Sequence, residues 1–219
     1  MNTYIVRKAR LPYDPEVNNQ QFWDVADKAQ VDVYRWYQSG EKWEAFAQLL
    51  YDADKLYFRM VSRNDHQIVA VSSQPNQPVY KDSCGELFIS PGPDVSIGYF
   101  NFEINCVGAM LLAFGTGRQG REFLRPELAR QVAVWHSVPG PTKAPSADDC
   151  CWEIQAAIPL AVLRAYVGFA TPKLGDVWRA NFQRCADGSA NPQWATWNPI
   201  ETPQADFHRP EFFGQLLFA

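Results

Sequence analysis

Amides and carboxylates alternate with large apolar side chains in two segments of this chain. Residues 99–105 read Tyr-Phe-Asn-Phe-Glu-Ile-Asn, and residues 177–183 read Val-Trp-Arg-Ala-Asn-Phe-Gln. Because successive side chains of a strand point to opposite faces, each segment predicts a strand with one apolar and one polar face. The predicted polar positions are Asn101, Glu103, Asn105, Arg179, Asn181 and Gln183.

A polar face of this composition could bind a ligand rich in hydroxyl groups. Carboxylates accept hydrogen bonds, and planar amides both donate and accept them in fixed directions, which suits sugar hydroxyls. The alternative is an ordinary solvated face, since antiparallel sheets commonly present one face to water.

Three aromatic residues lie where a ring is hard to explain as part of a strand core. Trp194 and Trp197 lie in the turn-rich segment 191–199, and Tyr80 precedes a predicted strand that begins at Glu86. A ring on the surface can stack on the C–H face of a sugar, so these residues are candidate platforms. The alternative is that the rings close the ends of the fold.

Strand signals dominate the rest of the chain. Residues 45–51 and 55–63 flank Asp52-Ala53-Asp54 and predict a hairpin, and a short helix is predicted over 160–166 after Pro159. The other predicted strands cover 86–90, 98–105, 109–114, 130–136, 151–158, 177–184 and 214–218. Many evenly spaced strands predict an all-β fold, an antiparallel, jelly-roll-like β-sandwich with one or two short helices. Without a linker or repeat, residues 1–219 are expected to form a single domain.

Charge and composition argue against several classes of partner. The net charge of −4 and pI near 5.4 argue against nucleic acid, which binds basic surfaces. No apolar segment reaches the roughly 18 residues of a membrane span, so no membrane partner is expected.

Residues 1–12 lack the apolar region of a secretory signal, and five cysteines fit no disulfide framework. A cytoplasmic location is therefore expected, or a secreted or periplasmic one if a leader has been removed.

Several short segments, in the same order, resemble the carbohydrate-binding modules of family 9, and most closely their bacterial family 9-like branch. Two of them read Trp-Glu-Ile-Gln-Ala-Ala-Ile-Pro over 152–159 and Trp-Ala-Thr-Trp-Asn-Pro over 194–199. The others are 56–59, 79–89, 101–108, 175–182 and 207–214. The resemblance implies a jelly-roll β-sandwich that holds a sugar or chain end between two aromatic rings, above polar strand residues.

By motif position, the resemblance implies platforms at Tyr80 and Trp197. It implies that Glu103 stands where characterised modules can carry a basic residue, which reverses the local charge. Some members hold structural calcium, for which Asp82 and Asp94 are the candidates here; no other cofactor is expected. The implied hydrogen-bonding groups are Glu86, Asn105, Asn181 and Gln183.

The sequence therefore favours non-catalytic carbohydrate binding, with a saccharide as the partner and the oligomeric state undetermined. The alternative is a carbohydrate-active enzyme, because two of Glu86, Glu103 and Glu153 could form the carboxyl pair of glycoside hydrolysis. Residues 115–120 match G-x-G-x-x-G, but no βαβ unit surrounds them, so they predict a turn. The predicted ligand-binding residues are Tyr80, Glu86, Glu103, Asn105, Asn181, Gln183, Trp194 and Trp197.

Overall fold

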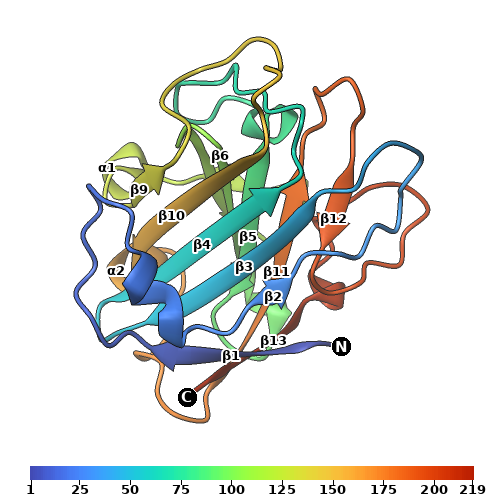
Figure 1. Cartoon of the computed structure of the whole chain (residues 1–219). Coiled ribbons are helices and arrows are strands. Elements are labelled where there is room, and N and C mark those ends of the chain that lie inside the picture. Colours follow the sequence, from blue (N-terminus) through green and yellow to red (C-terminus); the bar gives the residue numbers. More distant parts are fainter.

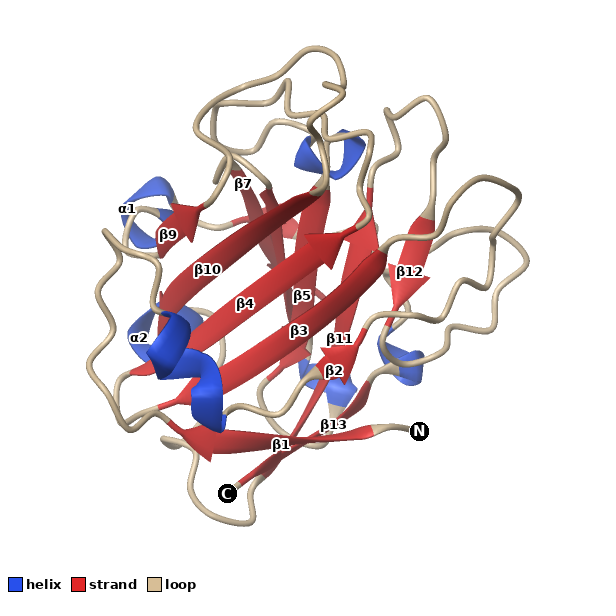
Figure 2. Ribbon diagram, viewed as in Figure 1, coloured by secondary structure: helices blue, strands red, loops and turns tan.

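The computed structural model describes residues 1–219, whose strands form two packed sheets (Figures 1 and 2). Sheet A contains, in spatial order, β8 (Glu122–Phe123), β7 (Met110–Gly115), β6 (Tyr99–Asn105), β5 (Cys84–Ser90), β11 (Val177–Cys185) and β13 (Gly214–Phe218). Sheet B contains β3 (Glu44–Tyr51), β4 (Lys55–Arg63), β10 (Cys151–Pro159) and β9 (Ala133–His136). β12 (Trp194–Thr196) pairs with β11, and β2 (Ala29–Gln30) pairs with β3.

Helices are short and lie between strands. The α-helices are α1 (Pro126–Ala129) and α2 (Leu160–Arg164), and the 3-10 helices are η1 (Gln20–Val25), η2 (Val79–Lys81), η3 (Val95–Ile97) and η4 (Pro210–Phe212). None of these helices is long and apolar enough to cross a membrane.

Apolar residues at alternate positions of both sheets fill the space between them. Leu87 and Ile89 of β5 and Phe182 of β11 are fully buried there. The rings of Phe58, from β4, and Phe182 stack across the two sheets with centroids 6.2 Å apart and an interplanar angle of 5°. This contact explains why the period-two pattern is strong in the long strands of both sheets.

The structure confirms the predicted β-sandwich and several of its elements. The strand predicted over 55–63 is β4, and it forms the predicted hairpin with β3. The strand predicted over 214–218 is β13, and the helix predicted over 160–166 ends earlier, at Arg164. The strand predicted over 130–136 begins only at Ala133, because α1 precedes it.

The N-terminal strand departs from the antiparallel pairing predicted for the sandwich. β1 (Thr3–Lys8) pairs in parallel with β13 through residues 3–6 and in parallel with β3 through residues 7–8. β1 therefore passes from one sheet to the other and joins them along one side (Figure 1). A parallel pair links distant segments without a hairpin, so no local turn signal announces it.

A buried ion pair connects the inner face of sheet A to the segment that follows β4. The Arg184 guanidinium donates to the Asp65 carboxylate, and both side chains are at most 1% exposed. The indole N–H of Trp152 donates to the same carboxylate at 2.7 Å. The guanidinium also lies over the Trp43 ring, 3.2 Å from its centroid, so its charge is compensated on two sides.

The outer face of sheet A is covered by loops rather than by a further sheet. A second apolar cluster, which includes Phe88, Tyr99, Phe207 and Phe213, packs between the strands and the loops before β13. The predicted polar positions of β6 and β11 lie on this outer face, and all except the half-buried Arg179 are buried because the loops cover them.

Candidate functional site

Strand register places two buried carboxyl groups side by side on the outer face of sheet A. Glu103 of β6 lies directly across from Glu86 of β5, which in turn lies directly across from Gln183 of β11. In the next row, Cys84 of β5 lies across from Cys185 of β11. Because directly opposed residues of an antiparallel ladder point to the same face, these side chains form one continuous surface.

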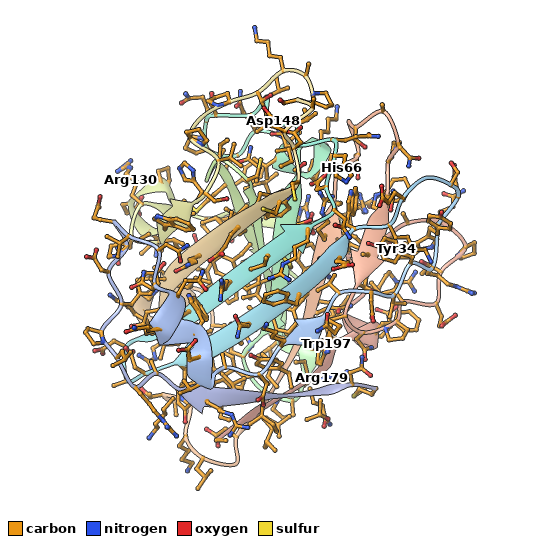
Figure 3. All side chains as sticks on the ribbon, in the orientation of Figure 1. Tyr34, His66, Arg130, Asp148, Arg179 and Trp197 are labelled. Carbon is orange, nitrogen blue, oxygen red and sulfur yellow. The ribbon has the colours of Figure 1, made fainter.

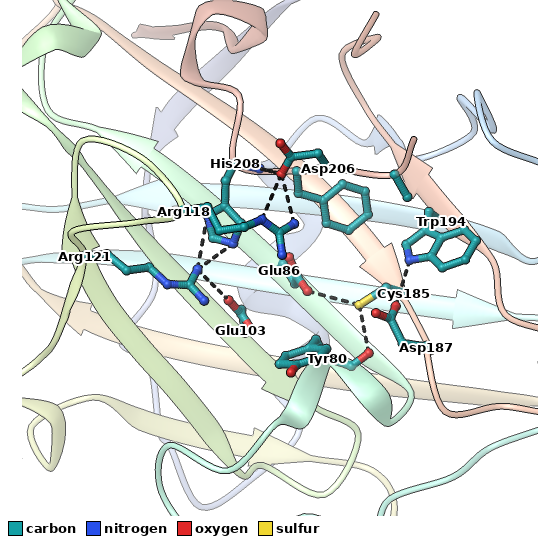
Figure 4. A pocket seen from close by; sticks show the side chains of 12 residues that line it. Tyr80, Glu86, Glu103, Arg118, Arg121, Cys185, Asp187, Trp194, Asp206 and His208 are labelled. Carbon is teal, nitrogen blue, oxygen red and sulfur yellow. Dashed lines mark hydrogen bonds and ion pairs between the residues drawn. The ribbon is translucent and has the colours of Figure 1, made fainter. Parts of the chain in front are cut away.

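Loops rise around this surface and enclose a pocket of about 210 Å³ (Figure 4). η2 contributes one wall, the glycine-rich turn after β7 a second, the loop after β11 a third, and the segment before η4 a fourth. The lining residues are Tyr80, Glu86, Glu103, Arg118, Arg121, Cys185, Asp187, Trp194, Ala205, Asp206, Phe207 and His208.

Glu86 forms part of the pocket floor and is 2% exposed. Burial, together with the neighbouring Glu103 carboxyl, raises the pKa of Glu86 well above its usual range. The Cys185 thiol donates to its Oε1 at 3.0 Å, which favours the ionised form but only weakly opposes burial. Burial therefore favours the protonated form of the Glu86 carboxyl in the unliganded pocket, and in that form it can donate a hydrogen bond.

Glu103 has a different environment on the same floor. Its Oε1 accepts a hydrogen bond from the Asn101 amide at 2.8 Å and lies 3.7 Å from Nη1 of Arg121. Its Oε2 is buried and has no hydrogen-bond partner within the protein. Burial raises the pKa of Glu103 to about 7, although Arg121 and Asn101 both lower it.

His208 holds the turn after β7 against the segment before η4. Its Nδ1 lies 2.8 Å from the Tyr99 hydroxyl, and Arg121 donates to the ring from the other side. Burial, and then the charges of Arg121 and Arg118, lower the pKa of His208 to about 2, so the imidazole is neutral. The residue is thus both a loop contact and part of the pocket wall.

Two half-buried aromatic rings, Tyr80 and Trp194, border the pocket. The indole N–H of Trp194 donates to Oδ1 of Asp187 at 2.7 Å, which fixes the ring. Burial raises the pKa of Asp187, and this hydrogen bond partly offsets the effect. Arg118 and Asp206 form a more exposed ion pair at 2.9 Å on the opposite side (Figure 4).

The structure brings four of the predicted ligand-binding residues to this pocket and leaves four outside it. Tyr80, Glu86, Glu103 and Trp194 line it. Their role in binding stays a prediction, but the geometry makes each accessible to a ligand. The residues that do not line the pocket are Asn105, Asn181, Gln183 and Trp197.

The amides of Asn105 and Asn181 stabilise loops instead of facing the pocket. Asn105 donates to the backbone oxygen of Ser72 and to the Asp82 carboxylate, at 2.9 and 2.8 Å. Asn181 donates to the backbone oxygen of Asn198 at 3.0 Å and accepts from its backbone N–H at 2.9 Å. The structure therefore does not bring these two residues to the pocket, because the segments that cover the sheet take their hydrogen bonds.

Gln183 lies next to the pocket without lining it. Its side chain is fully buried, and neither its Oε1 nor its Nε2 has a partner within the protein. Thr196, directly across the β11–β12 ladder, also has an unpartnered buried hydroxyl. Gln183 lies on β11, which is next to the strand of Glu86 and on the side away from the strand of Glu103.

The prediction that Trp197 is a stacking platform is wrong. The indole is 6% exposed and belongs to the core between the sheets, where it packs against Phe182 and Tyr4 at centroid distances of 5.3 and 6.4 Å (labelled in Figure 3). Trp194 and Thr196 share the outer face with Cys185 and Gln183, so the following position turns inward. Trp194 is the ring that reaches the pocket.

The buried position of Trp197 predicts that Gly214 tolerates no side chain. A Cβ at position 214 would overlap the Trp197 ring and would lie 2.9 Å from the backbone oxygen of Asn2. We expect Gly214→Ala to lower the free energy of unfolding by about 1–3 kcal/mol, as overpacking does. Urea denaturation of this variant beside Gly140→Ala, where a Cβ meets nothing within 4 Å, measures the effect. Equal stability of the two variants would contradict this packing.

Besides Cys185, five charged or titratable residues of the pocket were not predicted as ligand-binding. Two of them, Arg118 and Arg121, come from the glycine-rich turn after β7, which the sequence predicted only as a turn. Two arginines within such a turn were the available signal, because a loop that projects from a sheet readily brings charged side chains to a ligand. The others are Asp187, Asp206 and His208.

One group of three side chains has the composition of a metal site. Cys84, Glu86 and Cys185 offer two sulfur atoms and a carboxylate oxygen, all within 4.8 Å of one another. Asp82 and Asp94, the calcium candidates, belong to no such group. Asp82 accepts hydrogen bonds from the backbone of Val71 and Ser72, and Asp94 caps η3, so calcium at either residue stays a prediction.

The chain is similar to known carbohydrate-binding proteins in fold and to one protein family in sequence. No curated protein matches it. Its fold is similar to that of a Bacteroides uniformis protein with a proposed carbohydrate-binding role, with 26% identity, a TM-score of 0.87 and 99% of each chain covered. It is also similar to a family 9 carbohydrate-binding module of Caldicellulosiruptor kristjanssonii, solved in complex with glucose and with cellotriose.

That module is 14% identical in both complexes, with TM-scores of 0.66, and therefore supports the fold alone. The aligned region covers 100% of this chain and 96% of the module with glucose, and 99% and 93% with cellotriose. The sequence profile of carbohydrate-binding family 9 matches residues 19–218, which include every strand except β1. The chain belongs to carbohydrate-binding family 9.

Proposed function

We propose that the domain binds a saccharide without catalysis, with one sugar ring placed between Tyr80 and Trp194 in the sheet A pocket. The observation that carries the proposal is the unpartnered, buried Oε2 of Glu103, a residue that lines a pocket with an aromatic ring on each of two walls. A buried polar atom is stable only when it is hydrogen-bonded, and a sugar hydroxyl would donate to it.

The size and composition of the pocket suit a single sugar unit or a chain end. Its volume of about 210 Å³ is below the roughly 300–1,000 Å³ of pockets for drug-sized ligands. The Glu86 carboxyl can donate a hydrogen bond, Glu103 can accept one, and the two rings can cover the C–H faces. Affinity in the range of about 10⁻³–10⁻⁶ M is expected, because the sugar exchanges hydrogen bonds with water for similar ones.

The relatives support a saccharide as the ligand class. Membership of carbohydrate-binding family 9 covers nearly the whole chain. The C. kristjanssonii module binds glucose and cellotriose in its crystal structures. The choice of Tyr80 and Trp194 as the ring pair rests on their position at the pocket of this chain, and not on the contacts of that module.

Replacing Trp194 tests the proposed stacking. We expect Trp194→Ala to weaken sugar binding about tenfold, because the platform is lost and Asp187 loses its hydrogen-bond donor. Isothermal titration calorimetry with a panel of mono- and disaccharides measures it. Tyr37→Ala, an exposed aromatic outside the pocket, is the matched control and should bind like the wild type. Unchanged affinity in Trp194→Ala, or no binding by the wild type, would contradict the proposal.

A second candidate function, glycoside processing, is favoured by one observation. Glu86 and Glu103 are directly opposed across β5 and β6 and face the same pocket, as the two carboxyls of a glycosidase do. Glu153 cannot be a partner, because it lies on sheet B and pairs with Arg59 at 2.8 Å. Turnover of aryl glycosides by the purified chain, lost in both Glu86→Gln and Glu103→Gln, would favour this candidate over simple binding.

A further inference from the structure

The pocket holds more carboxyl groups than cations. Its charged lining consists of four carboxyls, from Glu86, Glu103, Asp187 and Asp206, and two guanidinium groups, from Arg118 and Arg121. The neighbouring His208 imidazole is neutral, because burial depresses its pKa. The lining therefore becomes negative once its carboxyls ionise.

Among the inner carboxyls, only Glu103 forms an ion pair with an arginine. Arg118 pairs with Asp206 at 2.9 Å, on the more exposed side of the pocket. Arg121 lies 3.7 Å from Glu103 on the Oε1 side. Glu86 and Asp187 take part in no ion pair, and their hydrogen-bond donors are the neutral groups Cys185 Sγ and Trp194 Nε1.

The geometry of Glu103 points to a missing donor inside the pocket. The residue is 2% exposed, lines the pocket, and keeps one carboxylate oxygen without a partner. Figure 4 shows its side chain directed toward the space between Glu86 and Tyr80. A donor placed there would contact Glu103 and also lie close to Glu86, its neighbour across the ladder.

The raised pKa values agree with a site whose carboxyls are only partly compensated. Burial raises the pKa of Glu86, of Glu103 and of Asp187, and the nearby arginines offset only part of the effect. A cation that entered the pocket would lower all three, since an opposite charge within about 4–6 Å favours the ionised carboxylate. The rings of Tyr80 and Trp194 would add cation–π attraction.

We infer that the pocket selects a saccharide that carries a protonated amine, an amino sugar, with its ammonium group held between Glu86 and Glu103. The inference rests on the proposed function, because the hydroxyl groups of the same ring would use the remaining polar lining. It explains why the floor carries two adjacent carboxyls, which a neutral sugar does not require. A small amine without a sugar ring would satisfy the carboxyls but leave the rest of the pocket without contacts.

Binding of the ammonium group should release protons. Burial raises the pKa of both Glu86 and Glu103 in the free pocket, and the ligand cation favours their ionised forms. The groups that face this pair come from every surrounding element. They are Cys84 of β5, Cys185 and Asp187 of β11 and its following loop, Arg118 and Arg121 of the turn after β7, Tyr80 and Lys81 of η2, and Asp206 and His208 before η4.

A matched series of sugars tests the inference by calorimetry near pH 6.5. Each amino sugar is compared with its own hydroxyl and N-acetyl forms, in the glucose, galactose and mannose series. We expect one amino sugar to bind at least tenfold tighter than both of its neutral forms. Repeating the titration in buffers of different ionisation enthalpy should show net proton release for the amine and none for the neutral forms.

Glu86→Gln is the matched variant, because it replaces the ionisable carboxyl by an amide of the same shape. The ratio of amino-sugar to neutral-sugar affinity should fall close to one, whereas Glu122→Gln, an exposed carboxyl on β8 outside the pocket, should keep the wild-type ratio. If Glu86→Gln does not fold, the proton release of the wild type still decides the question.

The failures of the two proposals are distinguishable. Equal affinities for the three forms of every sugar, a preference for an N-acetyl form, or binding without proton release would overturn the amino-sugar inference and leave saccharide binding intact. Absence of binding to every sugar would overturn both. Equal affinity for ethanolamine and the best amino sugar would show a general amine site and overturn the inference as well.

Discussion

Replacing Asp65 by alanine is expected to lower the free energy of unfolding by about 3–5 kcal/mol, because it leaves a guanidinium buried without its counter-charge. Arg184 is fully buried, and Asp65 is the carboxylate with which it pairs. The substitution also removes the acceptor of the Trp152 indole N–H. A domain of ordinary stability has about 5–15 kcal/mol in total, so the variant keeps only part of it.

Urea denaturation followed by tryptophan fluorescence measures this loss. Asp27→Ala is the matched control, because it breaks an ion pair with Arg7 in which both side chains are nearly half exposed, 47% and 45%. Exposed pairs contribute about 0–1 kcal/mol, so the control should unfold close to the wild type. A loss no larger for Asp65→Ala than for Asp27→Ala would mean that the buried pair does not stabilise the fold.

Stability should fall by about 3 kcal/mol as the pH rises from 4.5 to 7, because of Glu103 alone. The pKa of this carboxyl is about 7 in the folded chain, above its usual 4.5. Below pH 4.5 the carboxyl is protonated in both states and contributes nothing to the difference. Above it the unfolded chain loses the proton first, so the unfolded state is favoured until the folded carboxyl also ionises near pH 7. Glu86 acts in the same direction, since burial raises its pKa as well.

Glu103→Gln should remove most of this slope. The amide keeps the shape and can still accept from Asn101, but it does not ionise. Denaturation midpoints at pH 5 and pH 7.5 should therefore differ less in Glu103→Gln than in the wild type, and Glu122→Gln should retain the wild-type difference. The same pH dependence in all three proteins would show that the Glu103 carboxyl is not shielded from water.

The alternation of side chains predicted most of the long strands, because packing between the sheets requires it. The apolar partners of β4 and β11 meet at Phe58 and Phe182, so their pattern is imposed by the core itself. The outer face of sheet A carried an equally regular pattern, but there the pattern could not distinguish a ligand site from a covered surface. Asn181 shows the difference, since its partner, the backbone of Asn198, is brought over the sheet only by the fold.

The sequence predicted only four residues of the pocket, the floor carboxyls Glu86 and Glu103 and the rings of Tyr80 and Trp194. Glu103 could be named from the alternation of its predicted strand and Glu86 from the resemblance to family 9, whereas their direct opposition is a finding of the structure. Arg118 and Arg121 lie in a turn whose path over the sheet is not encoded in any local period. Trp197 was misplaced because a segment rich in turn residues contains a short strand, β12, whose alternation sends residue 194 outward and residue 197 inward.

The join between β1 and β13 has a consequence for biosynthesis. Residues 3–6 find their partners in residues 215–218, so the pairing spans nearly the whole chain. Because closing so long a loop is entropically costly, this contact should form late and slowly. A nascent chain on the ribosome cannot complete sheet A before its last strand has emerged, and until then the edge of β11 that β13 will occupy needs protection from other chains.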